Sequence, residues 1–320
     1  MSAAALPSDL ELEDLVRESL ASRFGTSRIS VLERTVVGQG SFPKEVLRLA
    51  VGDEELDLFC KYEGGFEHSA HGHRGGVSYE ARVYEEILAP GGYTTPEAML
   101  VHRPPGRSDT WLFVEFLSRA LRVSKATDPH AMAEAAAWVG RFHRGTTGAE
   151  VPAFIKRYGR DYYMGWVERT DAHVREARGV DVWWRGVLRG FEEHLHLLED
   201  FEPSMLHGEY YPKNVLWSRG RVSPVDWESA AFGAGVIDLV SLLDGWPEAT
   251  DRLCTDAYVR ARWPLGAPEW FSEQRSLAEM YLHFRWLGED RNPAARSGLP
   301  AREWRRVGRI RELAAGLGWL

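Results

Sequence analysis

The sequence predicts an α+β protein with two parts, a small β-rich N-terminal part and a larger α-helical C-terminal part. Short apolar, strand-like segments fill the region before Leu117, whereas apolar residues at helical spacing fill most of the chain after it. A chain of 320 residues is also too long for one simple core and suits one large domain or two lobes. We therefore expect one part over 1–117 and the other over 118–320.

The N-terminal part is expected to form a small antiparallel sheet with a helix across it. Ser8 suits the N-cap of the first helix, whose apolar residues recur on one side. A turn rich in glycine separates the first two strands, and a segment rich in Gly and His forms a loop before the second helix. The expected elements are a helix over 8–24, strands over 29–37, 46–51 and 56–62, a helix over 78–88, and a strand over 110–117.

The C-terminal part is expected to be mainly helical, interrupted by one polar loop over 206–217. Polar residues in a short loop between apolar segments are a common setting for enzyme chemistry. A short apolar strand, over 222–225, follows the loop. The expected helices span 129–144, 162–177, 184–198, 237–243, 248–262, 269–288 and 301–316.

Composition narrows the class of protein and of partner. The formal net charge of −8 gives no reason to expect nucleic acid or an anionic membrane surface as a partner. Two cysteines, Cys60 and Cys254, form no disulfide framework and favour a reducing cytoplasm. The first residues, MSAAALPSDLELEDL, lack the basic and apolar regions of a signal peptide, and no apolar run reaches the ~20 residues that span a bilayer.

Polar residues whose chemistry suits phosphoryl transfer from ATP recur in order along the chain. A strand lysine can neutralise phosphate oxygens, a helix carboxylate can hold that lysine, and glycines let backbone approach phosphates. Amide and carboxylate oxygens can ligate Mg²⁺, and a loop carboxylate can orient or deprotonate an attacking hydroxyl. The candidates are Gly38 and Gly40 in a turn, Lys61 in LDLFCKY, Glu80 on the next helix, Glu209 and Asn214 in LHGEYYPKNVLW, and Asp226 in PVDWE.

This order and spacing resembles the protein-kinase fold. The His-Gly-acid-x4-Asn loop with the later Asp-Trp-Glu resembles the aminoglycoside phosphotransferase and choline kinase family, which usually has Asp where Glu209 stands. The resemblance runs from about Val31 to Val240. It implies a bilobal protein-kinase-like fold that uses ATP and Mg²⁺, with a nucleotide-binding N-lobe over 1–117. The C-lobe, over 118–320, would carry the catalytic loop and bind the acceptor.

Matched position by position, the resemblance implies a role for each candidate. His207 would brace the catalytic loop, and the buried Asp238 would tie that loop down. Glu209 would stand at the position of the catalytic base, and Asn214 and Asp226 would bind Mg²⁺. Glu80 would pair with Lys61. The residues implied in nucleotide binding are Gly38, Gly40, Lys61, Glu80 and the backbone from Glu115 to Leu117.

Each candidate also has an ordinary structural alternative. Asn214 and Asp226 can cap turns, Lys61 can be a solvated strand end, and the glycines can form a plain hairpin turn. Three histidines in HSAHGH, at 68, 71 and 73, could gather a metal ion, although no cysteine or nearby acid completes a ligand set.

Two features indicate a small-molecule hydroxyl as the acceptor rather than a protein. Gly208 stands where many regulated protein kinases have an arginine that receives an activation-loop phosphate. Only nine residues, 229–237, separate Glu228 from Asp238, which leaves no room for a long peptide-presenting segment. Aminoglycosides, amino alcohols, sugars and other metabolites all fit, and plentiful acidic residues would suit a cationic acceptor. The oligomeric state stays open.

Glu209 leaves three hypotheses open. Glutamate reaches on the order of 1.5 Å further than aspartate, and a misplacement of ~1 Å can cost about 100-fold in rate. Glu209 could act as the base, or it could only position the hydroxyl, since a loose transition state needs little early proton removal. Alternatively, transfer is lost and the protein only binds a nucleotide or another ligand.

Overall fold

The computed structural model describes residues 6–38, 42–64, 71–106, 109–128, 130–175, 182–289 and 299–320. The chain divides into two compact units. The first comprises Met1–Lys125 and Asn214–Ser229, and the second comprises Ala126–Lys213 and Ala230–Leu320. The first unit therefore includes one short segment, 214–229, that is distant in the sequence from its other residues. The assignment of nucleotide and acceptor binding to separate lobes stays a prediction.

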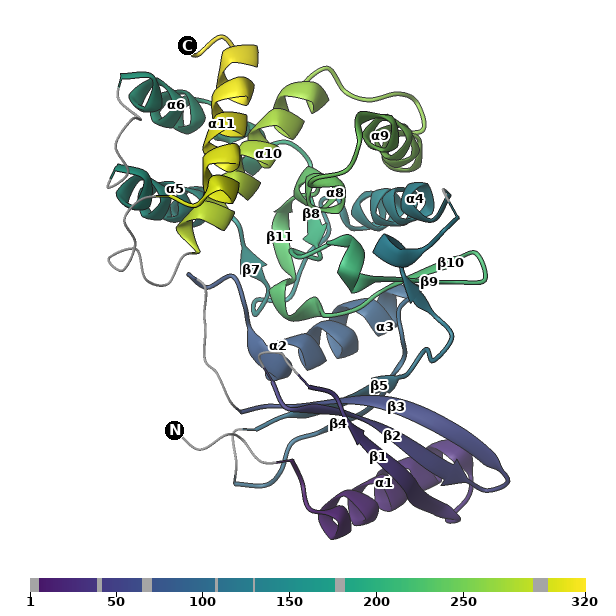
Figure 1. Ribbon diagram of the computed structural model, residues 1–320. Helices are drawn as coiled ribbons and strands as arrows, with labels where there is room; N and C mark the ends of the chain where they lie inside the picture. Colours follow the sequence, from purple (N-terminus) through teal and green to yellow (C-terminus); the bar gives the residue numbers. More distant parts are fainter. Residues whose placement is uncertain are drawn as a thin grey trace. The chain divides into compact units, whose positions relative to one another are not determined.

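The first unit is built on an antiparallel five-stranded sheet in the order β1-β2-β3-β5-β4 (Figure 1). Four of these strands were predicted from the sequence, and β4 was not. The register pairs Lys61 of β3 with Lys44 of β2 on one side and Leu112 of β5 on the other. The strands are β1 (Ile29–Val36), β2 (Lys44–Val51), β3 (Glu54–Tyr62), β4 (Ala98–His102) and β5 (Trp111–Glu115).

Helices cover both faces of this sheet (Figure 1). Helix α1 (Asp9–Phe24) begins at Ser8, whose hydroxyl accepts a hydrogen bond from the backbone N–H of Glu11 at 3.3 Å, as the sequence predicts. Its buried residues join the core that Cys60 and Tyr62 of β3 enter from the sheet. Because alternate strand residues point to opposite faces, Lys61 lies on the face covered by helix α2 (Gly76–Val83).

The sequence predicts one regular helix to residue 88, but helix α2 ends at Val83. It passes into a π-helical segment, Tyr84–Leu88, and then a short helix α3 (Ala89–Gly91). A second, smaller sheet of the first unit has the order β10-β9-β6. Its strands are β6 (Leu121–Arg122), β9 (Val215–Ser218) and β10 (Arg221–Pro224), and 3₁₀ turns lie at Val123–Lys125 and Trp227–Ser229.

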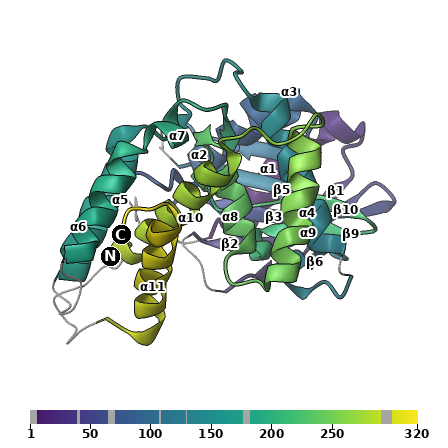
Figure 2. The same cartoon turned by 90° about the horizontal axis from the view of Figure 1, so that it is seen from above.

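The second unit is mainly helical, as predicted. Helix α4 lies alongside α9, while α10 packs against α5, α8 and α11 (Figure 2). Fully buried Trp166 and Trp184 contribute to its interior. The helices are α4 (His130–Thr146), α5 (Arg160–Arg175), α6 (Val182–Glu193), α7 (His196–Glu199), α8 (Val236–Leu243), α9 (Glu248–Arg262), α10 (Phe271–Gly288) and α11 (Ala301–Gly316).

A three-stranded sheet in the order β7-β11-β8 lies within the helical unit. Its strands are β7 (Lys156–Arg157), β8 (Pro203–Leu206) and β11 (Ala231–Ala234). The helix expected over 184–198 is divided into α6 and α7, and the expected polar loop contains a 3₁₀ turn at Pro212–Asn214 before β9 begins. Among the helices of the described residues, none is long and apolar enough to cross a bilayer.

Candidate active site

Lys61 is held between two carboxylates in the first unit. Its Nζ lies 2.7 Å from Oε2 of Glu80 on α2 and 2.5 Å from Oδ1 of Asp226, just beyond β10. Glu80 is almost fully buried, and its other oxygen accepts the backbone N–H of Trp227 at 3.1 Å. The predicted pairing of Glu80 with Lys61 is therefore confirmed. Glu80 also fixes the backbone directly after Asp226, a link that the sequence did not predict.

The charge on Lys61 is stabilised by this arrangement. Burial lowers the pKa of Lys61, but the charges and hydrogen bonds of Asp226 and Glu80 outweigh that effect and raise the pKa well above its usual value. The side chain of Asp226 remains 38% exposed, unlike that of Glu80 at 2%. The result is a fixed positive charge beside an accessible carboxylate, which suits the binding of phosphate oxygens and a metal ion.

Asn214 and Asp226 are brought to the same end of the β9–β10 ribbon. The backbone N–H of Val225 donates to the carbonyl of Asn214 at 2.9 Å, which extends the pairing of Val215 with Pro224 by one step. Asp226 has a φ of +73°, a left-handed backbone conformation that aspartate tolerates better than most residues and that often occurs at functional sites. The sequence alone did not indicate this conformation.

The donor set at this end of the ribbon fits Mg²⁺. An amide oxygen and a carboxylate are hard ligands, and Mg²⁺ usually takes only one or two protein carboxylates together with phosphate oxygens and water. Among the described residues, no group of three or more His, Cys, Asp or Glu side chains is placed to hold a metal ion alone. His68 lies outside the described residues, so that finding does not test whether the three histidines gather a metal ion. Within the described part, His73 is fully buried.

Glu228, the last residue of the Asp-Trp-Glu sequence, contacts the residues that precede helix α2. Its carboxylate lies 3.7 Å from Nε of Arg74, and its carbonyl accepts the backbone N–H of Gly75 at 2.8 Å. Burial raises the pKa of Glu228 to about 7, and the nearby negative charge of Asp226 adds to this. This contact connects the start of α2 with the segment that carries Asp226.

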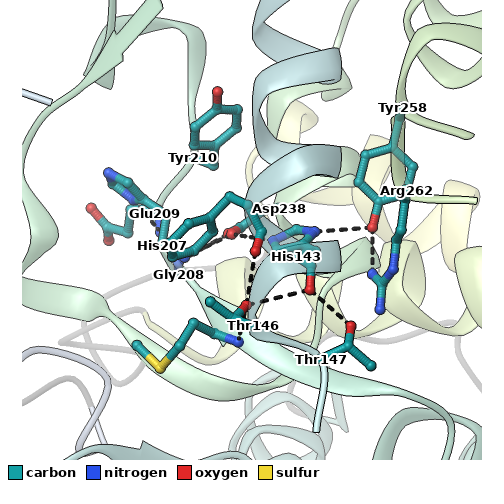
Figure 3. A network of polar contacts seen from close by, with 12 residues as sticks. His143, Thr146, Thr147, His207, Gly208, Glu209, Tyr210, Asp238, Tyr258 and Arg262 are labelled. Atoms are coloured by element: carbon teal, nitrogen blue, oxygen red, sulfur yellow. Dashed lines mark hydrogen bonds and ion pairs between the residues drawn. The ribbon is translucent and has the colours of Figure 1, made fainter. Parts of the chain in front are cut away.

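Asp238 fastens the loop that carries Glu209 in the second unit (Figure 3). The fully buried carboxylate of Asp238, on α8, accepts the backbone N–H of His207 at 2.7 Å and that of Gly208 at 2.9 Å. The expectation that Asp238 ties down this loop is confirmed. Gly208 has a φ of +81°, which an L-residue adopts only with strain, so glycine is required in this turn.

A buried polar chain extends from Asp238 to α4 and α9 (Figure 3). Nε2 of His143 lies 3.2 Å from Asp238, its Nδ1 lies 3.0 Å from the Tyr258 hydroxyl, and Arg262 donates to that hydroxyl at 2.5 Å. These contacts assign a neutral imidazole that donates through Nε2 to Asp238 and accepts from Tyr258. Burial lowers the pKa of His143 to about 4, against the opposing effect of Asp238.

The carboxylate of Glu209 points away from the Asp238 network (Figure 3). It lies near Arg285 of α10. Its Oε1 lies 3.5 Å from Nη1 of Arg285, and both side chains are buried. Arg285 also donates to the hydroxyl of Tyr211, and the backbone N–H of Glu209 donates to Nδ1 of His207 at 3.3 Å. The loop is thus braced by His207, as expected, while the acid itself is paired with a buried guanidinium group.

Sequence reasoning missed Arg285, although a signal was available. The residue lies inside an apolar run, YLHFRWLG, within a correctly predicted helix. A cation in such a run is rarely buried without an acidic partner. No pattern in the sequence identifies Glu209 as that partner.

The remaining predicted nucleotide-binding residues lie around the five-stranded sheet. Glu115 ends β5 with an exposed side chain, and its backbone N–H donates to the carbonyl of Glu97 at 2.9 Å. Leu117 follows and accepts the backbone N–H of Ala120 at 2.9 Å.

A Cβ atom added at Gly38 would contact nothing within 4 Å, so packing does not require glycine there. Gly40 lies outside the described residues. Their nucleotide contacts stay predictions.

Comparison with known proteins places this geometry in a family. Residues 67–273 match the profile of the phosphotransferase enzyme family. A curated relative, the N-acetylmuramate/N-acetylglucosamine kinase of Neisseria meningitidis serogroup B, is 29% identical over 105 residues. That match covers 32% of this chain and 31% of the relative, so the chain aligns with about a third of the relative's length.

Solved structures of similar fold cover nearly the whole chain. The choline kinase LicA from Streptococcus pneumoniae is 12% identical with a TM-score of 0.60, over 96% of this chain and 99% of its own. The choline kinase from Cryptosporidium parvum is 12% identical with a TM-score of 0.62, over 98% of both chains. The GDP complex of aminoglycoside 2′-phosphotransferase-IIIa is 14% identical with a TM-score of 0.59, over 95% and 99%. These likenesses confirm the predicted protein-kinase-like α+β fold, and the family match shows that the chain belongs to the phosphotransferase enzyme family.

Proposed function

We propose that this protein transfers the γ-phosphate of ATP to a hydroxyl group of a small molecule, with Mg²⁺ as the metal ion. The observation that carries the proposal is the position of Lys61, whose Nζ lies between Glu80 and Asp226. A buried lysine held by one helix carboxylate and directed at a second, accessible carboxylate matches the requirements of phosphate and metal binding. Membership of the phosphotransferase enzyme family supports the same reaction class.

In this proposal, Lys61 binds phosphate oxygens of ATP, and Glu80 keeps the lysine in place. The backbone between Glu115 and Leu117 meets the adenine, and the turn with Gly38 and Gly40 approaches the phosphates. Structures of the same fold support nucleotide and divalent-metal use, since LicA was solved with AMP and the amicoumacin kinase hAmiN with AMP-PNP and Ca²⁺.

Asn214 and Asp226 would hold Mg²⁺, which when bound neutralises charge on the phosphates. The amide oxygen and the carboxylate offer two ligands at one end of the β9–β10 ribbon. Because the Asp226 side chain is partly exposed, it is accessible to a hydrated ion. The left-handed backbone at Asp226 is the kind of local strain expected at a site where position matters.

Glu209 would act on the acceptor hydroxyl. The hydroxyl oxygen forms a bond to the γ-phosphorus, the bond from that phosphorus to the β–γ bridging oxygen breaks, and ADP leaves. The hydroxyl proton passes to the carboxylate of Glu209, either early as in base catalysis or late in a loose transition state. Arg285, whose Nη1 lies 3.5 Å from the Glu209 carboxylate, would help to hold that carboxylate in place.

The short connection after Glu228 supports a small-molecule acceptor. Residues 231–234 form strand β11, which pairs with β7 and β8, and helix α8 begins at Val236. No stretch is left in which a peptide-presenting segment could form. The kinase of Neisseria meningitidis named for N-acetylmuramate and N-acetylglucosamine supports sugars among the acceptors to be tested. Both cysteines are buried free thiols, which suits the proposed cytoplasmic location.

The proposal is tested by measuring ATP·Mg²⁺ binding by calorimetry and ADP release across a panel of hydroxyl acceptors. Lys61→Met should weaken ATP binding by about tenfold to 100-fold, the effect of losing a charged hydrogen bond. Lys125→Met is the matched control, because Lys125 is an exposed lysine of the same unit. Circular dichroism should show that both variants fold. Unchanged ATP affinity in a folded Lys61→Met protein would contradict the proposed role.

A non-catalytic binding protein on the same fold is the second candidate. The observation that favours it is the ion pair between Glu209 and Arg285, since a carboxylate that already contacts a guanidinium group is less available to an acceptor hydroxyl. Glu209→Gln discriminates the two functions. In an enzyme, we expect this substitution to reduce phosphotransfer by about 100-fold or more while ATP still binds. A binding protein would release no ADP with any acceptor, and the substitution would leave its ligand affinity unchanged.

A further inference from the structure

The surroundings of Glu209 in the second unit carry an excess of positive charge. Arg285 lies against the rings of Tyr211 and Trp286, with its Cζ 5.8 Å and 5.3 Å from their centres. Arg306 of α11 lies 4.8 Å from the Trp286 ring, and Nζ of Lys213 lies 5.4 Å from that of Tyr211. We call these five residues the cationic–aromatic cluster. It contrasts with the net charge of −8 of the whole chain and with the cationic acceptor that the acidic composition would suit.

The charges of the cluster are incompletely paired by the described residues. Arg306 lies 3.3 Å from Asp244, and Arg285 lies 3.5 Å from Glu209, a long separation for a charged hydrogen bond. The side chain of Lys213 is exposed, and Lys213 makes no ion pair with the described residues. Three cations therefore face two carboxylates, one of which is the acid that the reaction uses.

Arg285 is the member with the greatest capacity for a further partner. A guanidinium group carries five N–H donors in a planar fork that matches a carboxylate or phosphate. The described residues supply Arg285 with two acceptors, Glu209 and the Tyr211 hydroxyl. The indole N–H of Trp286 also has no hydrogen-bond partner among the described residues. Arg285 therefore brings N–H donors beside Glu209, whereas a cationic ligand would need acceptors.

We propose that the acceptor carries an anionic group, such as the carboxylate of a sugar acid, and that Arg285 binds this group while Glu209 faces the reacting hydroxyl. The inference rests on the proposed phosphotransfer and names its acceptor class. An anionic group gives Arg285 the charge partner that it shares poorly with Glu209. A cationic acceptor would be repelled by a buried guanidinium group, because two like charges interact more strongly where the dielectric constant is low. The rings of Tyr211 and Trp286, 5.6 Å apart, hold Arg285 between them and so fix the position of its guanidinium group.

The test compares three probes of similar size and different charge: glucuronate, glucose and glucosamine. Binding is followed by tryptophan fluorescence, both with and without AMP-PNP and Mg²⁺. Glucuronate should bind at least about tenfold more tightly than glucose, the effect of one charged hydrogen-bonded contact, and glucosamine should bind most weakly. Arg285→Gln should abolish this order, and Arg285→Lys should retain part of it because the charge remains.

Arg275→Gln is the matched control. Arg275 lies on the same helix and is ion-paired with Asp251 at 2.5 Å, but it makes no contact with Glu209, so the probe order should persist. Thermal melting checks that each variant folds. Equal affinities, no binding of any probe, or a preference for glucosamine would overturn the inference. If AMP-PNP fails to bind but the glucuronate preference is present, the proposed phosphotransfer falls and the anion site stands.

Discussion

His143 should make the stability of the second unit depend on pH in a predictable direction. The imidazole is fully buried between α8 and α9, where it faces Asp238, the hydroxyl of Tyr258 and the guanidinium group of Arg262. Burial lowers the pKa of His143 from 6.5 to about 4. Between these two pH values, the unfolded chain binds a proton that the folded protein does not bind. The free energy of unfolding therefore falls as the pH falls from 6.5 toward 4.

The size of the effect follows from the same pKa difference. Each pKa unit corresponds to about 1.4 kcal/mol, so the full contribution of His143 is about 3 kcal/mol, of which about 2 kcal/mol is lost by pH 5. The assay is urea denaturation between pH 8 and pH 4.5 for the wild type and for His143→Gln. Because glutamine does not titrate, the variant should lack this part of the pH dependence, whatever its stability at pH 8.

The comparison between variants separates His143 from the carboxylates that also titrate in this range. His196→Gln serves as control, since His196 is exposed on the surface of the same unit and its replacement should leave the wild-type pH dependence. A His143→Gln protein whose stability falls as steeply as that of the wild type between pH 6.5 and pH 4.5 would refute the assignment of a neutral, buried imidazole.

Two further predictions concern stability. Asp238→Asn should lower the free energy of unfolding by about 2–4 kcal/mol, since an amide cannot accept hydrogen bonds from both loop N–H groups and from His143 at once. Urea denaturation measures this loss. An unchanged midpoint would show that Asp238 does not hold the loop. Ser8→Ala should cost about 1 kcal/mol by removing the cap of α1, whereas Ser8→Gly should cost only a few tenths; equal losses in the two variants would argue against the cap.

Local patterns predicted the long elements of this fold well, because their apolar periodicity extends over many residues. Helix α9 spans Glu248–Arg262 and α11 spans Ala301–Gly316, as expected from the sequence, and Ser8 caps α1. Strand β11 was missed because its four residues, AFGA, are all buried and show neither alternation nor β-branched side chains. Tertiary pairing with β7 and β8 forms this strand, and no local signal indicates it.

The candidate site shows the same division between local and distant information. The pairing of Lys61 with Glu80 could be predicted, because strand β3 and helix α2 follow one another and a lysine and a glutamate suit each other. The contact of Lys61 with Asp226 joins residues 165 positions apart, and no local pattern indicates it. Arg285 is similarly remote from Glu209 and could be recognised only as a cation in an apolar helix.

Two helices of the second unit determine where the Glu209 carboxylate lies. Helix α8 contacts the backbone before Glu209, and helix α10 contacts the carboxylate itself. Asp238 of α8 fixes the backbone at His207 and Gly208, so the start of the loop does not depend on which acid follows. The extra methylene of glutamate, on the order of 1.5 Å of reach, is therefore expressed at the carboxylate, where Arg285 of α10 meets it. An aspartate on the same backbone would stop short of Arg285 and leave a buried guanidinium group without its carboxylate, an arrangement that costs several kcal/mol. Glu209 and Arg285 are thus mutually dependent. The departure from aspartate in this loop is thus accompanied by a contact between Glu209 and the buried Arg285.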